Sequence, residues 1–387
     1  MEADRPPILN PQFSILYPEL SRPLKILHLT LGADAGGLST YIIKLGTAMI
    51  AQGHEISVAG DTGAWQWAFD ESPLKYIQIP LKGGWFSFRK SARMLRAYMR
   101  DNAIDVLHTH YRRATLLGRK LQSQRRPPIL YTLHLSHLNL KFPRNLFSDF
   151  GDVSHVASLD AQDWLINDAH VPENRIRFIP HGIDINHFSP TTFEQRINAR
   201  QQLKLGAEDR VAIFVGRLDH PKNEDWLIDL ASAAGAQVPN LKIFLVGEGP
   251  HEPQLRLRIA SENLMDRVFL TGHQDPLPYY RAADAILLPS IREGFSLVLA
   301  EAMATGVPAL RTRTSGTREL IIENVTGRSV PIDHDAFIAA AIDFLVDSGK
   351  LKSMGAAASE LVRKNFSFDQ QLSRTLDLYR SISKLTD

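Results

Sequence analysis

Residues 288–308 read LPSIREGFSLVLAEAMATGVP, and this stretch decides the fold. It opens on the end of an apolar run that is typical of a buried strand, and a turn holding Glu293 and Gly294 follows. The apolar-rich letters over 296–305 predict a helix, because they begin with serine, a preferred helix N-cap, and because Gly306 ends them. A strand that leads through a turn into a helix is the building unit of a parallel sheet covered by helices.

The same alternation of short apolar runs and helical segments extends along the whole chain. In the second half, strands are predicted at 211–215, 241–246, 268–270, 285–288 and 308–311. In the first half, a strand at 24–31 leads through a glycine-rich turn into a helix at 38–52, and further strands are predicted at 55–59, 105–109, 129–133, 153–158 and 175–179. This pattern predicts an α/β protein with doubly wound, Rossmann-like parallel sheets.

The length of 387 residues exceeds what one hydrophobic core usually serves, so two domains are expected. A proline-bearing stretch at 186–192 separates the two series of strands, and it predicts an N-terminal domain over 1–190 and a C-terminal domain over 191–366. The last segment, 367–387, is predicted to be a helix that packs back across the junction. Ligands of such sheets bind beyond the carboxyl ends of the strands, so two sheets facing each other would form a cleft.

Composition excludes several classes of protein. The chain has no cysteine, which rules out disulfides, thiolate metal sites and a cysteine nucleophile. No segment approaches the roughly 20 consecutive apolar residues that a membrane-spanning helix needs. Residues 1–20 lack the basic start and apolar block of a secretory signal, and we expect a cytoplasmic protein.

The turn and helix at 289–305 have the chemistry of an anion site. The first amides of a helix lack partners within it, so those of residues 295–297 can bind a pyrophosphate, helped by the helix dipole. Glu301 lies roughly 7 Å further along the axis, where its carboxylate can accept hydrogen bonds from both hydroxyls of a ribose. The alternative is that Glu293 only supports the start of the helix and Glu301 is only solvated.

The stretch resembles the paired-glutamate signature of the retaining GT-B glycosyltransferases of family four (glycosyl transferases group 1). That signature is a glutamate, seven residues and a second glutamate, embedded here as EGFSLVLAEAMATGVP. Other segments similar to the family are FVGRLDHPKN at 214–223, LVGEGP at 245–250, TGHQDPLPYYRAADAILLPS at 271–290 and SGTREL at 315–320. The first half matches more thinly, through GADAGGLSTYIIKLGTAMIAQGHEISV at 32–58, DVLHTH at 105–110, YTLHLSH at 131–137 and IPHGIDINHFSP at 179–190.

The resemblance implies the GT-B architecture and a retaining, metal-independent glycosyltransferase of cell-envelope polysaccharide or glycolipid synthesis. Its donor would be a UDP- or GDP-sugar, its acceptor a hydroxyl of a glycan, a lipid-linked or a small molecule, and it would need no cofactor and no nucleic acid. The implied catalytic residues are Arg217, Lys222, Glu293 and His134. The implied donor contacts are Gly36, Gly37, Gly216, His273, Gly294, Phe295, Ser296, Leu297 and Glu301, and the acceptor side is assigned to His110 and Tyr111.

The chemistry of Arg217 and Lys222 suits this role. The leaving nucleoside diphosphate gains negative charge as the sugar bond breaks, and two fixed cations with the helix amides can replace a divalent metal. Three positions depart from the family pattern and leave the loop shape, and with it the donor sugar, open. Asn223 stands where glycine usually follows the lysine, the pair at 317–318 replaces a more common glycine-rich turn, and His181 replaces the usual asparagine.

Other functions have weaker support in the residues. The histidines His108, His110, His134 and His137 suggest zinc, but no carboxylate stands at ligand spacing and histidines also line sugar sites, so no metal site is predicted. The Asp-His-Asp triplet at 333–335 is better explained by helix capping. The competing functions are a GT-B sugar-nucleotide epimerase, a phosphorylase, and a non-catalytic sugar-nucleotide-binding subunit.

Residues 82–144 are strongly basic, with fourteen lysines and arginines against Asp101 and Asp105. Within them, residues 88–100 set an apolar stripe (Phe88, Ala92, Leu95 and Met99) beside a basic one (Arg89, Arg93, Arg96 and Arg100), and two aromatic residues, Trp85 and Phe86, precede them. Interfacial helices on anionic lipid have this pattern, which predicts peripheral contact with the inner face of the cytoplasmic membrane. The alternative is an ordinary helix that covers a core and solvates its basic flank.

Overall fold

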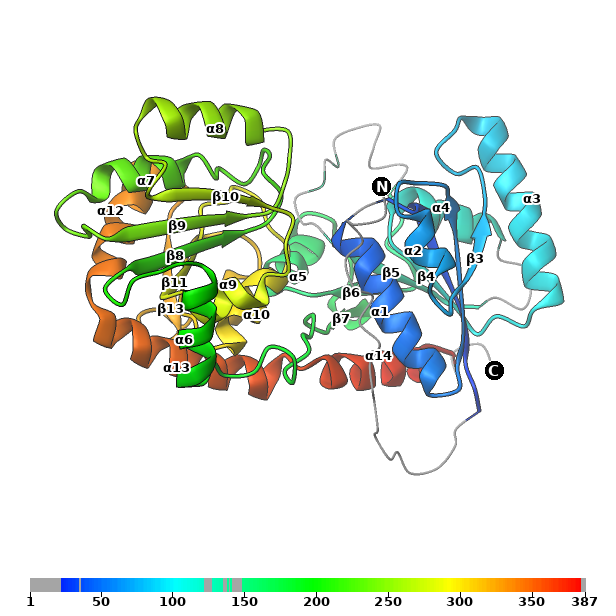
Figure 1. Ribbon diagram of the computed structural model, residues 1–387. Coiled ribbons are helices and arrows are strands. Elements are labelled where there is room, and N and C mark those ends of the chain that lie inside the picture. Colours follow the sequence, from blue (N-terminus) through cyan, green and yellow to red (C-terminus); the bar gives the residue numbers. More distant parts are fainter. Residues whose placement is uncertain are drawn as a thin grey trace. The chain divides into compact units, whose positions relative to one another are not determined.

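The computed structural model describes residues 22–34, 36–121, 127–134, 138, 140 and 148–383 (Figure 1). Contacts divide the chain into two compact units, each a sheet with helices. Unit 1 comprises Met1–Ala157, Ala161–Ile179 and Leu372–Asp387, and unit 2 comprises Ser158–Asp160 and Pro180–Gln371. The main division therefore falls between Ile179 and Pro180, ahead of the boundary at 190/191 that the prolines indicate. The C-terminal segment returns to unit 1 at Leu372.

The sheet of unit 1 has seven parallel strands in the order β3-β2-β1-β4-β5-β6-β7. Their bounds are β1 Lys25–Gly32, β2 Glu55–Asp61, β3 Lys75–Gln78, β4 Val106–Thr109, β5 Ile129–Leu133, β6 Val153–Val156 and β7 Ile176–Phe178. The strand order reverses between β1 and β4, so the loops after these two strands lie at the topological switch point, where doubly wound sheets bind ligands.

The helices of unit 1 are α1 Gly37–Ala51, α2 Gln66–Asp70, α3 Trp85–Asp101, α4 Arg112–Leu121, α5 Leu159–Asn167 and α14 Phe368–Ser383, the last two shared with unit 2 at their first residues. One face of the sheet packs against α3 and α4 through Leu27, Leu29, Leu107, Leu95 and Leu117. Side chains alternate along a strand, so His28 and His108 lie on the opposite face. That face meets α14 through Tyr379 and α1 through Tyr41.

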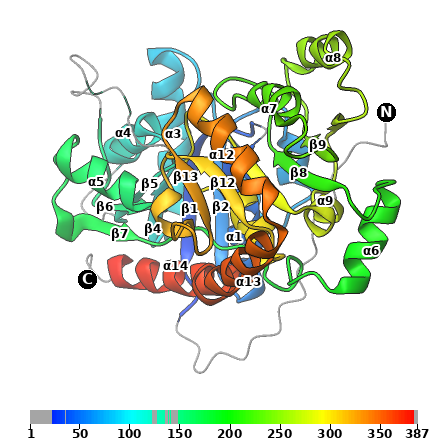
Figure 2. The same cartoon turned by 90° about the vertical axis from the view of Figure 1, so that its left-hand side faces the viewer.

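The sheet of unit 2 has six parallel strands in the order β10-β9-β8-β11-β12-β13. They are β8 Arg210–Val215, β9 Leu241–Val246, β10 Val268–Gly272, β11 Ala285–Leu288, β12 Ala309–Thr312 and β13 Gly327–Val330. The helices are α6 Phe193–Gln202, α7 Trp226–Ala234, α8 Glu252–Ser261, α9 Leu277–Ala282, α10 Leu297–Ala304, α11 Thr317–Leu320, α12 His334–Val346 and α13 Ser348–Asn365. Figure 2 shows α12 over β12 and β13, which it contacts. Here the order reverses between β8 and β11.

Every strand predicted from the sequence is present, and the predicted α/β class with two doubly wound sheets is confirmed. Two strands, β3 and β13, were not predicted. Local predictions hold as well: Gly53 has the left-handed conformation expected after α1, and the Asp333 carboxylate caps α12 by accepting from the Ala336 amide at 2.9 Å. Within the described residues no helix is long and apolar enough to cross a membrane.

Candidate functional site

Two loops of unit 2 meet at the point where its strand order reverses. One loop runs from Gly216 to Asn223 after β8, and the other runs from Pro289 to Ser296 after β11. The Ile291 amide donates to the Pro221 carbonyl at 2.9 Å, and the Asn223 side-chain amide donates to the Pro289 carbonyl at 3.1 Å. The β8 and β11 loops are therefore joined directly.

The charged residues of the site lie on these two loops. Lys222 Nζ and Glu293 Oε1 are 2.7 Å apart, and both side chains are largely buried. Arg217 pairs with Asp219 at 2.6 Å, and 69% of its side chain is exposed. Each of the two predicted cations is thus paired with its own carboxylate. The Arg217 side chain also extends into solvent, where an anion can reach it.

The glycines of this region are required by close backbone packing. A Cβ atom on Gly247 would lie 1.9 Å from the Gly216 carbonyl oxygen, and one on Gly249 would lie 2.3 Å from the Leu218 carbonyl oxygen. These clashes explain why LVGEGP carries two glycines. Asn223, the departure from the family pattern, has φ of 51°, a conformation that asparagine adopts more readily than most residues. It therefore serves the backbone need that glycine usually meets.

Helix α10 begins at Leu297, with Ser296 at the predicted N-cap position. The Ser296 hydroxyl makes no capping hydrogen bond. Within the described part of the chain, the buried hydroxyls of Ser296 and Ser290 have no hydrogen-bond partner. Phe295 is buried and packs edge-on against His181 at a centroid distance of 5.9 Å. The start of the helix thus combines unpaired amides with two hydroxyls that a ligand or a water can satisfy.

Glu301 lies on α10, and its Oε2 accepts a hydrogen bond from the Tyr280 hydroxyl at 3.1 Å. Tyr280 is fully buried, and burial together with the charge of Glu301 raises the pKa of Tyr280 well above its ordinary value. The tyrosine therefore stays a donor and fixes the carboxylate. His273, also predicted on the donor side, follows β10 and is exposed.

Arg311, at the end of β12, is fully buried and was not predicted. It donates to the Ser315 carbonyl at 3.2 Å and to the Thr314 hydroxyl, and Glu293 is the acid that acts most strongly on its charge. Burial lowers the pKa of Arg311, and Glu293 opposes this effect. The next turn packs against the Glu293 loop, because a Cβ on Gly316 would lie 2.6 Å from the Gly294 carbonyl oxygen.

In unit 1, Gly36 and Gly37 form the N-terminus of α1 after β1. Gly36 has φ of 136°, which side-chain-bearing residues rarely adopt, and added Cβ atoms on Gly36 and Gly37 would meet no atom of the described residues within 4 Å. The backbone here is open to a ligand. The second loop of the switch point carries Tyr111, which lines a hollow of about 620 Å³ together with apolar residues and two arginines, among them Leu31, Trp85, Phe88, Leu116, Arg112 and Arg113.

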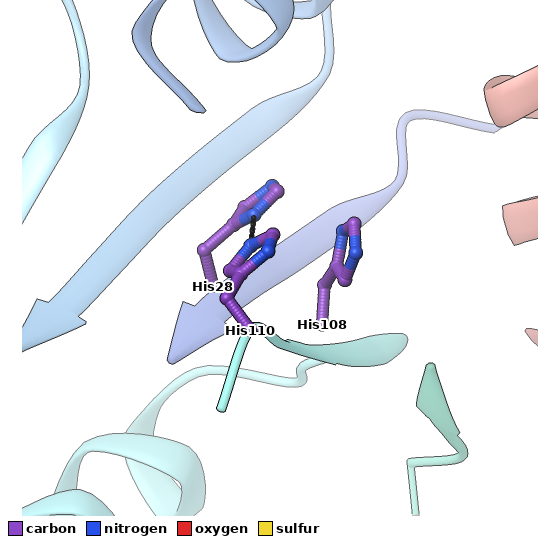
Figure 3. A group of neighbouring side chains, drawn as sticks. All are labelled: His28, His108 and His110. Carbon is purple, nitrogen blue, oxygen red and sulfur yellow. Dashed lines mark hydrogen bonds between the residues drawn. The ribbon is translucent and has the colours of Figure 1, made fainter. Parts of the chain in front are cut away.

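A row of polar side chains crosses the buried face of the unit 1 sheet from β1 to β6. It consists of His28, His108, His110, Thr132, His134 and His155. His28 Nδ1 and His110 Nε2 are 2.9 Å apart, and Figure 3 shows this hydrogen bond beside His108. His110 Nδ1 is 3.0 Å from His134 Nε2. Burial lowers the pKa of His28 and of His134 to about 3, and that of His110 well below its ordinary range.

The ring nitrogens of His28, His108 and His110 lie close enough together to suggest a metal site (Figure 3). Both nitrogens of His108 are already engaged, by Tyr379 and by Thr132, each at 2.6 Å. Both nitrogens of His110 are engaged as well. A metal would have to break most of these bonds, and the group of three histidines found among the described residues includes no carboxylate to balance its charge, so the donor set fits a hydrogen-bond network better. His137 lies outside the described residues.

The amphipathic segment at 88–100 forms part of α3. Ala92 and Leu95 are buried, and Phe88 and Met99 pack against the core of unit 1. The apolar stripe therefore serves this core, while Trp85 and Phe86 are exposed. Four basic residues of the wider region lie outside the described residues, namely Arg125, Arg126, Lys141 and Arg144.

Comparison with known proteins gives consistent matches over both units. The model of the family described as "Glycosyltransferase Family 4" matches residues 35–187, and that of "Glycosyl transferases group 1" matches residues 195–361. A D-inositol 3-phosphate glycosyltransferase of Xylanimonas cellulosilytica is 25% identical over 91% of this chain and 93% of its own length. A lipopolysaccharide core biosynthesis mannosyltransferase of Rhizobium meliloti is 31% identical over 53% of this chain and 61% of its own length.

Solved structures show the same fold. Anabaena HepE in complex with UDP superposes with a TM-score of 0.81 at 21% identity, covering 92% of this chain and 100% of that one. A glycosyltransferase from Rickettsia africae gives a TM-score of 0.80 at 19% identity, covering 94% of this chain and 99% of that one.

Proposed function

The chain belongs to family four of the glycosyltransferases with the GT-B fold, and from this membership we propose that it transfers a sugar from a nucleoside-diphosphate sugar to a phosphate-bearing acceptor, with retention and without a metal. The observation that carries the proposal is the Lys222–Glu293 pair beside the start of α10, at the switch point of the unit 2 sheet. A cation, a carboxylate and open amides are the groups that a sugar diphosphate requires.

In this reaction the bond between the anomeric carbon and the diphosphate oxygen breaks, and a bond to the acceptor hydroxyl oxygen forms on the same face of the sugar. The hydroxyl proton passes to the leaving diphosphate. Arg217 and Lys222 stabilise the charge that develops there, and the amides of 295–297 add to this stabilisation. Glu293 orients both the sugar hydroxyls and Lys222, because its carboxylate already lies 2.7 Å from the Lys222 ammonium.

Glu301 binds the ribose of the donor in this proposal. Its carboxylate is fixed by Tyr280, so it is oriented before the nucleotide arrives. A UDP-type donor is favoured, since the HepE structure contains UDP. In unit 1, Gly36, Gly37 and His134 are assigned to the phosphate and the transferred sugar, as the family resemblance implies.

The acceptor is assigned to the hollow beside Tyr111. Its lining joins apolar side chains to Arg112 and Arg113, and this combination suits a small ring that carries a phosphate. The names of several relatives, which are D-inositol 3-phosphate glycosyltransferases, point to the same class of acceptor. His110 belongs to the row of buried polar side chains, so it would affect the acceptor only indirectly, through the residues that it contacts.

The test is release of nucleoside diphosphate from UDP-glucose, UDP-N-acetylglucosamine or GDP-mannose in the presence of inositol 3-phosphate. We expect turnover that EDTA leaves unchanged and that Lys222→Met lowers on the order of a hundredfold, because one fixed charge at the leaving group is lost. Lys352→Met, an exposed lysine on α13, is the matched control. Complete inhibition by EDTA that magnesium reverses would refute the metal-free mechanism, and a product of inverted anomeric configuration would refute retention.

A further inference from the structure

Arg311 is a buried cation that the proposed mechanism does not use. It lies near the end of β12, and its side chain is fully buried. Its guanidinium donates to uncharged groups, namely the Thr312 carbonyl at 3.2 Å, the Ser315 carbonyl at 3.2 Å and the Thr314 hydroxyl. In the part of the chain that the structure describes, its Nη1 atom has no hydrogen-bond partner. A buried charge without a paired opposite charge costs free energy, so its presence calls for a functional explanation.

Two contacts bring Arg311 to the loop that carries Glu293. Strand pairing places Arg311 beside Leu288, the last residue of β11. The turn that its guanidinium holds packs against the β11 loop, because a Cβ on Gly316 would lie 2.6 Å from the Gly294 carbonyl oxygen. Arg311 and Glu293 therefore lie at the same end of the sheet, on neighbouring strands and loops.

The acids around Arg311 act on its charge with different strengths. Glu293 acts most strongly, and Glu319 and Asp160 act more weakly. The two weaker acids have partners of their own, a backbone amide for Glu319 and an arginine at 3.7 Å for Asp160. Glu293 thus interacts with two cations, with Lys222 in direct contact and with Arg311 through space.

The pairing of Lys222 has a consequence for donor binding. In the proposed function the Lys222 ammonium interacts with the diphosphate, but in this structure it lies 2.7 Å from the Glu293 carboxylate. Of the Glu293 side chain 11% is exposed, so little water could solvate the carboxylate if the ammonium turned away. Leaving one charge of a buried ion pair alone is strongly unfavourable. A second cation that does not move with Lys222 lowers this cost, and Arg311 is held by burial and by its hydrogen bonds.

We propose that Arg311 is a positioning residue whose fixed charge balances the Glu293 carboxylate, so that the ammonium of Lys222 can turn to the diphosphate of the donor. The inference rests on the proposed function, which assigns Lys222 to the diphosphate and Glu293 to the transferred sugar. Arg311 is fully buried, so it does not touch the donor itself. Its effect on donor binding has to pass through Glu293, unlike that of Arg217, which an anion can reach directly.

A double-mutant cycle between Arg311 and Glu293, measured by calorimetry with UDP, tests this path. Arg311→Gln removes the charge and keeps an amide N–H for the turn. In the wild-type background we expect it to weaken UDP binding about tenfold, because Lys222 then stays with Glu293 and one charge-assisted hydrogen bond to the diphosphate is lost. In the Glu293→Gln background the same substitution should weaken UDP binding less than about twofold, because no carboxylate is left to balance.

Arg311→Lys is the conservative variant, since it keeps the charge and loses the planar fork that holds the turn. We expect it to bind UDP within about twofold of the wild-type affinity. Arg328→Gln is the matched control, because Arg328 lies on the next strand, β13, is largely buried and pairs with Asp343. This control should leave UDP binding unchanged.

An equal loss of affinity in both backgrounds would overturn the proposal, because Arg311 would then act on the diphosphate or on the fold and not through Glu293. A loss of about tenfold in Arg311→Lys would overturn it as well, since the hydrogen bonds of the turn would then matter and the charge would not.

Glu293→Gln alone keeps the proposal falsifiable if no Arg311 variant folds. Its affinity for UDP should stay within about twofold of wild type, whereas a gain of about tenfold would mean that Glu293 withholds Lys222 from the diphosphate in spite of Arg311. These measurements do not require turnover. A protein that binds UDP in the expected pattern but releases no nucleoside diphosphate from a donor would contradict the proposed function alone, and a protein that binds neither UDP nor GDP would overturn both.

Discussion

Acid should destabilise unit 1 well before its carboxylates titrate. Three of its buried histidines, His28, His134 and His155, have pKa values lowered by burial to about 3, about 3 and about 4. Unfolding returns each ring to water, where its pKa is about 6.5. Because the pKa is lower in the folded state, the unfolded state binds more protons. The stabilisation is therefore complete above pH 6.5 and is lost as the pH falls towards the folded pKa values.

The magnitude follows from the size of these shifts. Each of the three histidines lowers the free energy of unfolding by about 1.4 kcal/mol for every pH unit below 6.5, which is about 2 kcal/mol at pH 5. The three histidines together remove about 6 kcal/mol from the free energy of unfolding between pH 7 and pH 5, and His108 and His110 act in the same direction. Domains are typically stable by about 5–15 kcal/mol, so unit 1 should approach unfolding near pH 5.

Tryptophan fluorescence can report on unit 1 alone. Four of the five tryptophans lie in it, at positions 65, 67, 85 and 164, and Trp226→Phe removes the one in unit 2. Urea unfolding of this variant at pH 7, 6 and 5 gives the free energy of unfolding at each pH. His28→Asn should reduce the pH dependence by about one proton.

A loss of less than about 1 kcal/mol between pH 7 and pH 5 would refute the reasoning, because it would mean that the row accepts protons without unfolding.

Two further predictions concern ligands. Glu301→Gln should weaken binding of free UDP about tenfold, because Glu301 is assigned to the ribose, whereas Glu293→Gln should chiefly weaken binding of the UDP-sugar, because Glu293 is assigned to the sugar. Calorimetry with both ligands separates the two effects, and equal losses of affinity in both variants would contradict the assignment. Contact with an anionic membrane is proposed from the basic face of α3, and each arginine near anionic lipid adds about 1 kcal/mol to the binding free energy. Binding to anionic liposomes, measured by co-sedimentation, should therefore be lost at high salt and in a variant with Arg89, Arg93, Arg96 and Arg100 changed to glutamine. Wild-type protein that stays in the supernatant at low salt would exclude this contact.

Most of the fold could be predicted because buried parallel strands are runs of apolar residues. The two strands that escaped prediction, β3 and β13, each lie at one edge of their sheet, and the strands at the other edges are β7 and β10. The sequences of β3 and β13, KYIQ and GRSV, mix polar and apolar residues, since an edge strand buries less of its surface. The membrane prediction drew on a real pattern, but the apolar stripe of α3 that suggested it packs on the core of unit 1.

The candidate site was only partly predictable. Lys222 and Glu293 were identified through motifs, but their direct pairing depends on two loops far apart in the sequence. Tyr280 and Arg311 were missed for the same reason. His28 left a weak signal, a polar residue in the middle of the apolar run at 24–31. The role of His28 depends on its hydrogen bond with His110. The pairing of strands brings these two residues together, and no spacing within the sequence indicates it.

The return of the chain to unit 1 at Leu372 limits how this protein can be divided. Residues 1–179 without the tail would lack Tyr379, and His108 Nδ1 would lose its hydrogen bond with the Tyr379 hydroxyl. An N-terminal half exchanged between relatives, or expressed by itself, must therefore carry the last sixteen residues, Leu372–Asp387, joined back by a linker. Recombination at a single point between the halves should yield chimeras whose unit 1 is incompletely folded, so the fold that carries the proposed acceptor site is inherited as two separate pieces of sequence.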